Sequence, residues 1–122
     1  MELKTIKVGI MPLEQYKQRT INIAKGIYKP KKDEPKIWFQ SIKSIAQVLS
    51  NDNQALLQTI LDNKPQSLKE LEDITGRAKS NLSRTLKTLE RYGIVELHRV
   101  SNTIVPEVKA TRFTVEFGLE AA

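Results

Sequence analysis

The residues best suited to recognition chemistry lie between 77 and 91, in the stretch RAKSNLSRTLKTLER. Arranged as a helix, in which successive residues stand about 100° apart, this stretch places three leucines on one side and a polar, basic row on the other. The leucines are Leu82, Leu86 and Leu89, and the opposite row is Ser80, Arg84, Lys87 and Arg91. Five bases accompany a single acid, Glu90. Arginine and asparagine side chains bond the edges of guanine and adenine, whereas lysine, serine and threonine suit phosphates or either base. The spacing therefore favours a helix face that contacts nucleic acid.

A second amphipathic segment precedes this helix and indicates how it is held. Ser67 and Glu70 have capping-box spacing, which predicts a helix beginning near Leu68. Leu68, Leu71 and Ile74 recur every three residues before Gly76, where positive φ costs little. Gly93 ends the second helix in the same way. Two short helices joined this tightly are typical of a helix-turn-helix.

A solvated helix face is the alternative interpretation of the basic row. We favour DNA because the row lies on the second helix of the motif, whose first turn meets base edges. We expect Asn81, Ser83, Arg84 and Thr88 to face bases, and Arg77, Lys79, Ser80, Lys87 and Arg91 to face phosphates or the groove wall.

The residues after Gly93 change to a period of two, which predicts a hairpin. One strand runs from Ile94 to Val100, and a second begins at Ile104 and contains Pro106, which suits an edge or a bulge. Arg99, Ser101 and Asn102 at the tip are placed to reach the DNA backbone or minor groove. We expect a modest contribution, because the tip carries little charge.

The stretch GRAKSNLSRTLKTLERYGIVEL resembles the recognition helix and first wing strand of winged helix-turn-helix regulators of the MarR and ArsR type. The matching residues are Ser83, Arg84, Leu86, Lys87, Leu89, Gly93, Ile94 and Val95. With the segments at 39–41 and 106–108, residues 37–118 are more similar to a prokaryotic family of proposed DNA-binding proteins. That family is often encoded beside a small toxin, as its antitoxin. One departure is Ala78, which stands where such helices often have a Ser or Thr N-cap, so we expect capping to shift to Ser80.

The resemblance implies repression of the protein's own operon. It also implies neutralisation of a cognate toxin protein, through residues 1–36 or through the helix face that they cover.

The segments on either side of the helix-turn-helix and hairpin also show helix or strand periodicity. We expect a strand over 3–10, an amphipathic helix from Pro12 to Ile27, helices over 41–49 and 53–62, and a strand over 111–117. The helix after Pro12 serves its own domain, a dimer interface or a partner, and the sequence does not separate these. Residues 29–36, KPKKDEPK, are predicted to be a solvated linker that buries nothing.

Several side chains have predicted places in the core or at helix ends. Trp38 and Phe39 are expected in the core rather than stacked on a base. Asn51 or Asp52 is expected to cap the helix over 53–62. On the strand over 111–117, the predicted buried side is Phe113, Val115 and Phe117.

Composition limits the function classes. A chain of 122 residues fits one domain with a short appendage, and its small core favours a homodimer. The net charge of +6 and the isoelectric point of about 9.6 favour an anionic partner. With no cysteine, disulfides and thiolate metal sites are excluded, which agrees with a cytoplasmic protein. No apolar run is long enough to span a bilayer, so no membrane partner is expected.

Catalytic constellations are not visible in the sequence. His98 is the only histidine, so no metal site, catalytic triad or cofactor is expected. Neither a Walker A motif nor a glycine-rich dinucleotide loop occurs, which argues against an enzyme.

The expected fold is mainly α with a small β component, a winged helix-turn-helix with an N-terminal strand-helix extension. The expected domains are residues 1–28 for dimer or partner binding, a linker over 29–36, a DNA-binding domain over 37–118 and a tail over 119–122. The expected function is sequence-specific binding of double-stranded DNA by a dimeric transcriptional regulator, an autoregulating repressor and antitoxin. The alternative is a winged-helix module that binds only protein.

Overall fold

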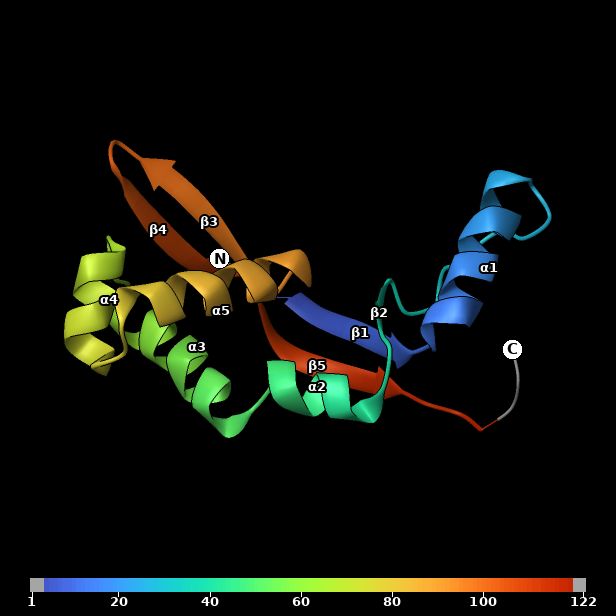
Figure 1. Cartoon of the computed structure of the whole chain (residues 1–122), viewed down its shortest axis with the longest axis horizontal. Coiled ribbons are helices and arrows are strands. Elements are labelled where there is room, and N and C mark those ends of the chain that lie inside the picture. Colours follow the sequence, from blue (N-terminus) through green and yellow to red (C-terminus); the bar gives the residue numbers. More distant parts are fainter. Residues whose placement is uncertain (1–3, 120–122) are drawn as a thin grey trace. The chain divides into compact units, whose positions relative to one another are not determined.

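The computed structural model of the chain describes residues 4–119, and Figure 1 shows its elements in order. They are β1 (Lys4–Ile10), α1 (Leu13–Ala24), β2 (Ile37–Phe39), α2 (Ile42–Val48), α3 (Asn51–Asn63), α4 (Leu68–Thr75), α5 (Lys79–Arg91), β3 (Val95–Val100), β4 (Thr103–Val108) and β5 (Ala110–Glu116). The strands form two sheets, one ordered β2-β1-β5 and one that pairs β3 with β4. Residue 3 of the expected first strand and residues 120–122 of the expected tail lie outside the described residues.

The expectation of a mainly α fold with a small β component was wrong, because the chain has an α/β fold. Helices make up 46% and strands 25% of the described residues, with a parallel three-stranded sheet and an antiparallel pair. The element missed in the sequence is β2, which runs parallel to β1 and pairs Val8 with Ile37 and Ile10 with Phe39. Parallel neighbours need a crossover connection, and here the connection contains α1. The segments β1, α1 and β2 therefore form a β-α-β arrangement.

The chain divides into two compact units. We call residues 47–111 with Lys4 the helical unit, which contains α3, α4, α5, β3 and β4. We call residues 5–46 and 112–119 the sheet unit, which contains α1, β2 and most of β1 and β5. The boundary falls inside α2, between residues 46 and 47.

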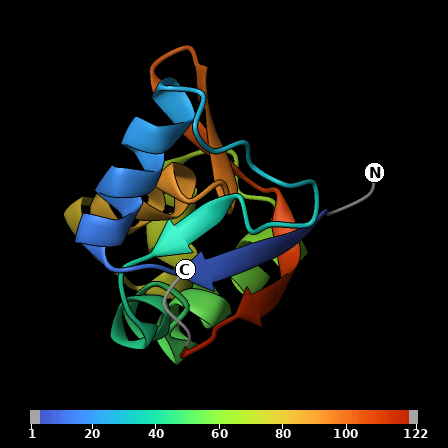
Figure 2. The ribbon, with the colours of Figure 1, turned by 90° about the vertical axis from the view of Figure 1, so that its right-hand side faces the viewer.

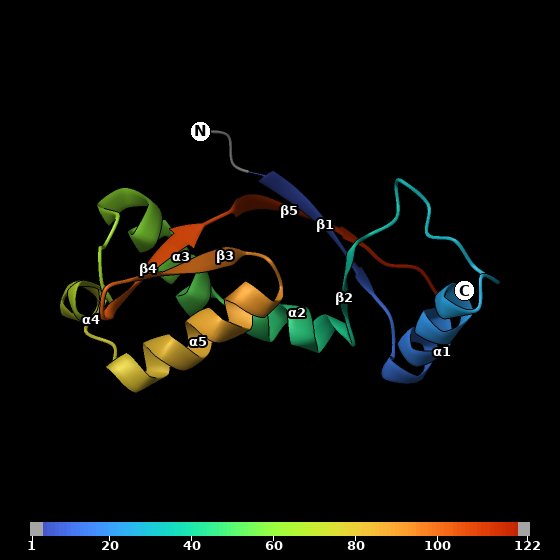
Figure 3. The same ribbon diagram turned by 90° about the horizontal axis from the view of Figure 1, so that it is seen from above.

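Leucines spaced along the helices build the core of the helical unit. Leu71, Leu82, Leu86 and Leu89 are completely buried, which confirms the inward side predicted for α5. Within this unit α5 packs against α4 and β3, and the β3–β4 hairpin follows it directly (Figure 3). The apolar row of α5 therefore fixes the helix on the unit and leaves the opposite side in solvent.

The helix ends follow the capping predictions in part. The Ser67 hydroxyl accepts a hydrogen bond from the Glu70 backbone N–H, as predicted, while the Glu70 carboxylate reaches the Gln66 N–H instead of the cap residue. Gly76 ends α4 with φ of 75°. The N-cap of α3 is Ser50, whose hydroxyl accepts from Asn53, so the prediction of Asn51 or Asp52 was wrong. Because the Ser50 hydroxyl caps the helix, α3 begins at Asn51, one residue before the first of the two predicted caps could act.

The three strands of the sheet unit lie side by side in Figure 2. Glycine at position 9 is required by close approach, because an added Cβ would lie 2.4 Å from Trp38 Cζ3 and 2.9 Å from Pro35 Cγ. Phe39 is 1% exposed, which confirms it as core, whereas Trp38 is half-buried. Arg19 of α1 lies 5.3 Å from the Trp38 ring centroid. The Trp38 ring therefore packs close to Gly9 and beneath the Arg19 guanidinium.

The prediction that residues 29–36 bury nothing was wrong. Pro35 is buried and Glu34 is half-buried. The Glu34 carboxylate accepts hydrogen bonds from Arg19 Nη2 at 2.7 Å, from the Tyr28 hydroxyl and from the Lys31 N–H. These donors, led by Tyr28, lower the pKa of Glu34 to about 2, and the same bond raises the pKa of Tyr28. The segment is thus tied to α1 by a charged hydrogen-bond cluster.

The last strand differs from its prediction in burial. β5 lies next to β1 of the same chain. Phe113 is half-buried, but Val115 is 49% exposed and Phe117 is 52% exposed, so their predicted burial was wrong. Nothing in the local alternation distinguishes a covered sheet face from an open one.

No helix among residues 4–119 combines the length and the apolar content needed to cross a membrane.

Candidate nucleic-acid interface

The outward side of α5 carries the basic row predicted from the sequence. Lys79, Ser80, Arg84, Lys87 and Arg91 are all exposed. They stand opposite three leucines with no exposed surface. The structure therefore brings these five side chains together on one helix and directs them to solvent.

The cations of this row form no ion pair with any residue between 4 and 119. Elsewhere, lysine and arginine side chains form ion pairs, such as Arg19 with Glu34 and Lys69 with Asp73. Among residues 4–119, the side chains of Arg84, Lys87 and Arg91 make no salt bridge or side-chain hydrogen bond. Their charge is thus available to an anion outside the chain.

Arg77 behaves differently from the other predicted phosphate ligands. It is half-buried, and its Nε donates to Asn81 Oδ1 at 2.9 Å while Nη2 donates to Thr85 Oγ1 at 3.2 Å. Asn81 and Thr85 are four residues apart and lie on one flank of α5, and the Arg77 side chain reaches both from the connection that precedes the helix. The Asn81 oxygen is occupied, and its amide nitrogen remains as a donor. Thr85 was not among the predicted site residues, although the i, i+4, i+8 spacing was present in the sequence.

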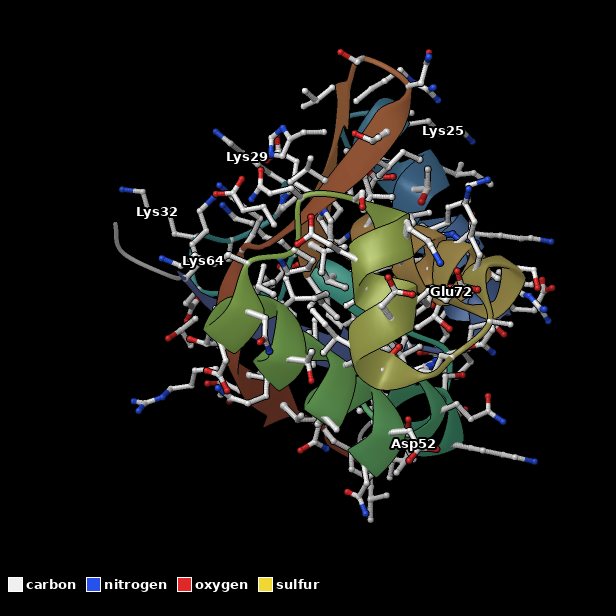
Figure 4. The ribbon with its side chains drawn as sticks, turned by 90° about the vertical axis from the view of Figure 1, so that its left-hand side faces the viewer. Lys25, Lys29, Lys32, Asp52, Lys64 and Glu72 are labelled. Atoms are coloured by element: carbon white, nitrogen blue, oxygen red, sulfur yellow. The ribbon has the colours of Figure 1, made fainter. Side chains whose placement is uncertain are left out.

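The first turn of α5 has no cap from its own side chains. Ala78 is the N-cap and makes no side-chain hydrogen bond, so the expected shift of capping to Ser80 was wrong. The carboxylate of Glu72, on α4, instead accepts from the Lys79 N–H at 3.3 Å. Figure 4 labels Glu72 on α4, close to the chain that leads into α5. Glu72 is a site residue that the sequence analysis missed, because the bond links two helices rather than neighbours in one.

Ser83 and Thr88, the two smallest side chains predicted to contact bases, are half-buried. They lie at the margins of the exposed basic row of α5. The Thr88 hydroxyl donates to the Arg84 backbone carbonyl at 3.2 Å, so its hydrogen is used inside the helix. Thr88 keeps its acceptor lone pairs and its methyl group for an outside contact.

The hairpin presents its tip to solvent as predicted. β3 and β4 are antiparallel, with Val100 opposite Thr103 at the tip. Arg99, Ser101 and Asn102 are exposed, and Ser101 adopts φ of 56°. Pro106 pairs with Leu97 inside β4 and is buried, so it sits in a strand that has only one partner.

A histidine–carboxylate cluster on the hairpin was not anticipated. His98 Nε2 lies 2.8 Å from Glu107 Oε1 and 3.8 Å from Glu96 Oε1, and the three groups could together hold a cation. Lys109 Nζ is 3.8 Å from both carboxylates. The hydrogen bond with His98 lowers the pKa of Glu107. The two acids face each other across the strands, Lys109 offsets their repulsion, and His98 shares a hydrogen bond with Glu107.

An open hollow lies beside the start of α5. It measures about 600 Å³ and is lined by α3 residues including Asp52, by the α4–α5 connection and by Asn81. Asp52 is labelled at the beginning of α3 in Figure 4. The hollow adjoins the Arg77–Asn81 pair, which makes that flank of α5 concave.

Comparison with known proteins places the chain in a family. The family model for HVO_A0114 matches residues 48–115, more than half of the chain, and the chain belongs to the HVO_A0114 family. The matched residues include α3, α4, α5 and the hairpin. No curated protein matches the sequence. No solved structure matches it.

Proposed function

We propose that the chain binds double-stranded DNA in a sequence-specific way, as a dimeric regulator that represses its own operon. The helices α4 and α5 act as a helix-turn-helix, α5 enters the major groove, and the β3–β4 hairpin is a wing beside it. The observation that carries the proposal is the row of unpaired cations on the exposed side of α5, opposite a fully buried leucine row.

Each side chain has a role within the proposal. Arg84 is exposed at the middle of α5 and is suited to a bidentate contact with guanine. Lys87 and Arg91 extend the row and suit phosphates on one groove wall. Arg77 is held against α5 and positions Asn81 by bonding its amide oxygen, which leaves the amide nitrogen as a donor to a base. The wing tip adds one cation, Arg99.

Titration of the chain with duplexes tests this assignment. The first duplex is the DNA upstream of its own gene, and the second has the same composition in scrambled order. Arg84→Ala is expected to weaken binding to the upstream duplex by about 10- to 100-fold and to reduce discrimination against the scrambled one. Lys43→Ala, which removes an exposed lysine from α2, is the matched control and should leave both affinities unchanged. Equal affinities of wild type and the Arg84→Ala variant would refute the role of α5.

The alternative function is a module that binds only protein. It predicts no shift of either duplex even at low salt, where non-specific binding to phosphates is strongest. The unpaired cations of α5 favour DNA over this alternative.

The proposed antitoxin role concerns α1. Leu13, Tyr16 and Ile21 are 43%, 42% and 45% exposed, so much apolar surface of this helix is open to a partner protein. Co-purification with the product of the adjacent gene tests the role. Leu13→Asp is expected to abolish a complex that Gln15→Asp, at an exposed neighbouring position, retains. Failure of the wild-type chain to form a complex would remove the toxin partner and leave the DNA proposal standing.

A further inference from the structure

The β5 strand lies at the open edge of the sheet in the sheet unit. In the order β2-β1-β5, one side of β5 pairs with β1, and the other has no strand beside it within residues 4–119. The edge at β2 is only three residues long, whereas β5 has seven. A long edge strand offers unpaired backbone N–H and C=O groups to another strand.

The side chains of β5 alternate between apolar and polar types. Val115 and the following Phe117 are about half exposed, and Phe113 on the same side is half-buried. On the other side, Arg112, Thr114 and Glu116 are exposed. Glu116 lies 3.8 Å from Lys7 of β1, and Arg112 has no partner among the described residues. The apolar side of β5 is therefore only partly covered by the rest of the described chain, and its Arg112 side chain has no ion-pair partner there.

We propose that β5 pairs antiparallel with β5 of a second copy of the chain, with the twofold axis at Thr114. The pairing sets Arg112 opposite Glu116 of the second copy, Phe113 opposite Val115, and Thr114 opposite itself. Opposite charges, aromatic with β-branched residues and threonine pairs are each favourable cross-strand combinations. The two sheets become one continuous sheet of six strands.

The charge pattern selects this arrangement over others. Arg112 and Glu116 are equidistant from Thr114, so antiparallel pairing centred there forms two ion pairs by symmetry. Parallel pairing in register places arginine against arginine and glutamate against glutamate. A slip by one residue puts the apolar sides of the two copies on opposite faces. A second copy is therefore the occupant that the strand fits best.

This inference rests on the dimer of the proposed function and specifies its surface, but it does not depend on DNA binding. The pairing is tested on the full chain without DNA.

A single introduced cysteine tests the symmetry axis, because the chain has no cysteine of its own. In the Thr114→Cys variant the two cysteines stand directly opposite each other across the twofold axis. Their Cα–Cα distance lies in the range that a disulfide needs, so mild oxidation is expected to give a covalent dimer. Thr111→Cys is the matched control on the same strand. Its two thiols are about 20 Å apart in the proposed pairing, so it should remain uncrosslinked.

Charge exchange tests the ion pairs. Arg112→Glu alone and Glu116→Arg alone are each expected to raise the dimer Kd at least 5-fold by sedimentation equilibrium. The double variant Arg112→Glu with Glu116→Arg restores opposite charges across the axis and should recover most of the affinity. A double variant no better than either single variant would contradict the pairing.

The outcomes separate this inference from the proposed function. A wild-type chain that is monomeric at tens of micromolar rejects the dimer and the β5 pairing together. A dimer in which the Thr114→Cys variant does not crosslink rejects the β5 pairing alone. Crosslinking through position 114 in a chain that fails to bind DNA rejects the DNA proposal alone.

Discussion

The helical unit and the sheet unit differ in how they use apolar residues. Apart from glycine and proline, twelve of the fifteen buried apolar residues of the described chain belong to the helical unit, and three, Val8, Met11 and Phe39, belong to the sheet unit. The exposed large apolar side chains show the reverse distribution. Eight of ten lie in the sheet unit, namely Leu13, Tyr16, Ile21, Ile27, Ile42, Val115, Phe117 and Leu119.

The difference indicates two kinds of surface. The helical unit completes its own core and exposes cations on α5, which is the surface expected for a polyanion. The sheet unit leaves apolar area in water, which in small proteins commonly marks a protein–protein interface. We infer that the helical unit contacts DNA and that the sheet unit contacts protein.

The largest expected effect is a core truncation in the helical unit. Leu86→Ala removes a side chain with no exposed surface and should lower the free energy of unfolding by about 2–5 kcal/mol. Val115→Ala, at a half-exposed position of the sheet unit, should change the stability of the monomer little. Urea denaturation of both variants at low protein concentration measures the contrast. Similar losses in the two would mean that the sheet unit is packed as well as the helical unit.

A smaller loss of stability is expected from a steric clash introduced into the sheet unit. Gly9→Ala brings a methyl group within 2.4 Å of Trp38, so the ring must move, at a cost of about 1–3 kcal/mol. Gly26→Ala is the control, because no atom lies within 4 Å of its added Cβ and only the strain of φ at 76° remains. Thermal unfolding followed by tryptophan fluorescence reports both. An unshifted spectrum and midpoint for the Gly9→Ala variant would contradict the tight contact.

The Glu34 cluster predicts a pH-dependent effect of moderate size. The folded pKa of about 2 is below the ordinary value of 4.5, so the carboxylate stabilises the fold above about pH 4.5. This contribution is lost as the pH falls toward 2. Glu34→Gln should therefore lower the melting temperature by several degrees at pH 7 and have almost no effect at pH 2. The matched variant Glu14→Gln alters an acid that is 88% exposed, and it should be nearly neutral at both pH values.

The smallest expected effect concerns the link between α4 and α5. Glu72→Gln keeps an acceptor oxygen for the Lys79 N–H but removes the negative charge beside the start of α5. Stability should fall slightly, and DNA affinity should rise slightly because an acid near the phosphates is gone. Glu70→Gln, which lies on the same helix away from Lys79, controls for the loss of charge in general. A fall in DNA affinity for the Glu72→Gln variant would show that the carboxylate positions α5.

The parts predictable from the sequence are those governed by local rules. The serine at 67, the glycines at 76 and 93 and the leucine spacing of α5 each act within one or two helical turns. They gave the helix bounds and the exposed basic row close to those observed. The closed core of the helical unit follows from the same periodicity.

The parts that were missed depend on contacts between distant segments. Three residues, 37–39, are too short to show a strand pattern, and they become β2 only because β1 is available to pair. Pro35 packs near Gly9, and Glu34 accepts hydrogen bonds from Arg19 and Tyr28. These contacts join positions that are distant in the sequence, so local patterns in the lysine- and proline-rich segment do not predict them. The cap of α5 comes from another helix for the same reason. Tertiary pairing therefore decided the fold class and the fine geometry of the site.

The salt dependence of DNA binding tests the central claim most directly. The logarithm of the association constant should fall linearly with the logarithm of salt concentration, with a slope of about 0.9 for each phosphate neutralised. We predict that Lys87→Ala reduces this slope by about one and weakens all duplexes alike, while Lys43→Ala leaves it unchanged. A slope that is the same in wild type and in the Lys87→Ala variant, or binding that does not depend on salt, would contradict the assignment of the α5 row to DNA.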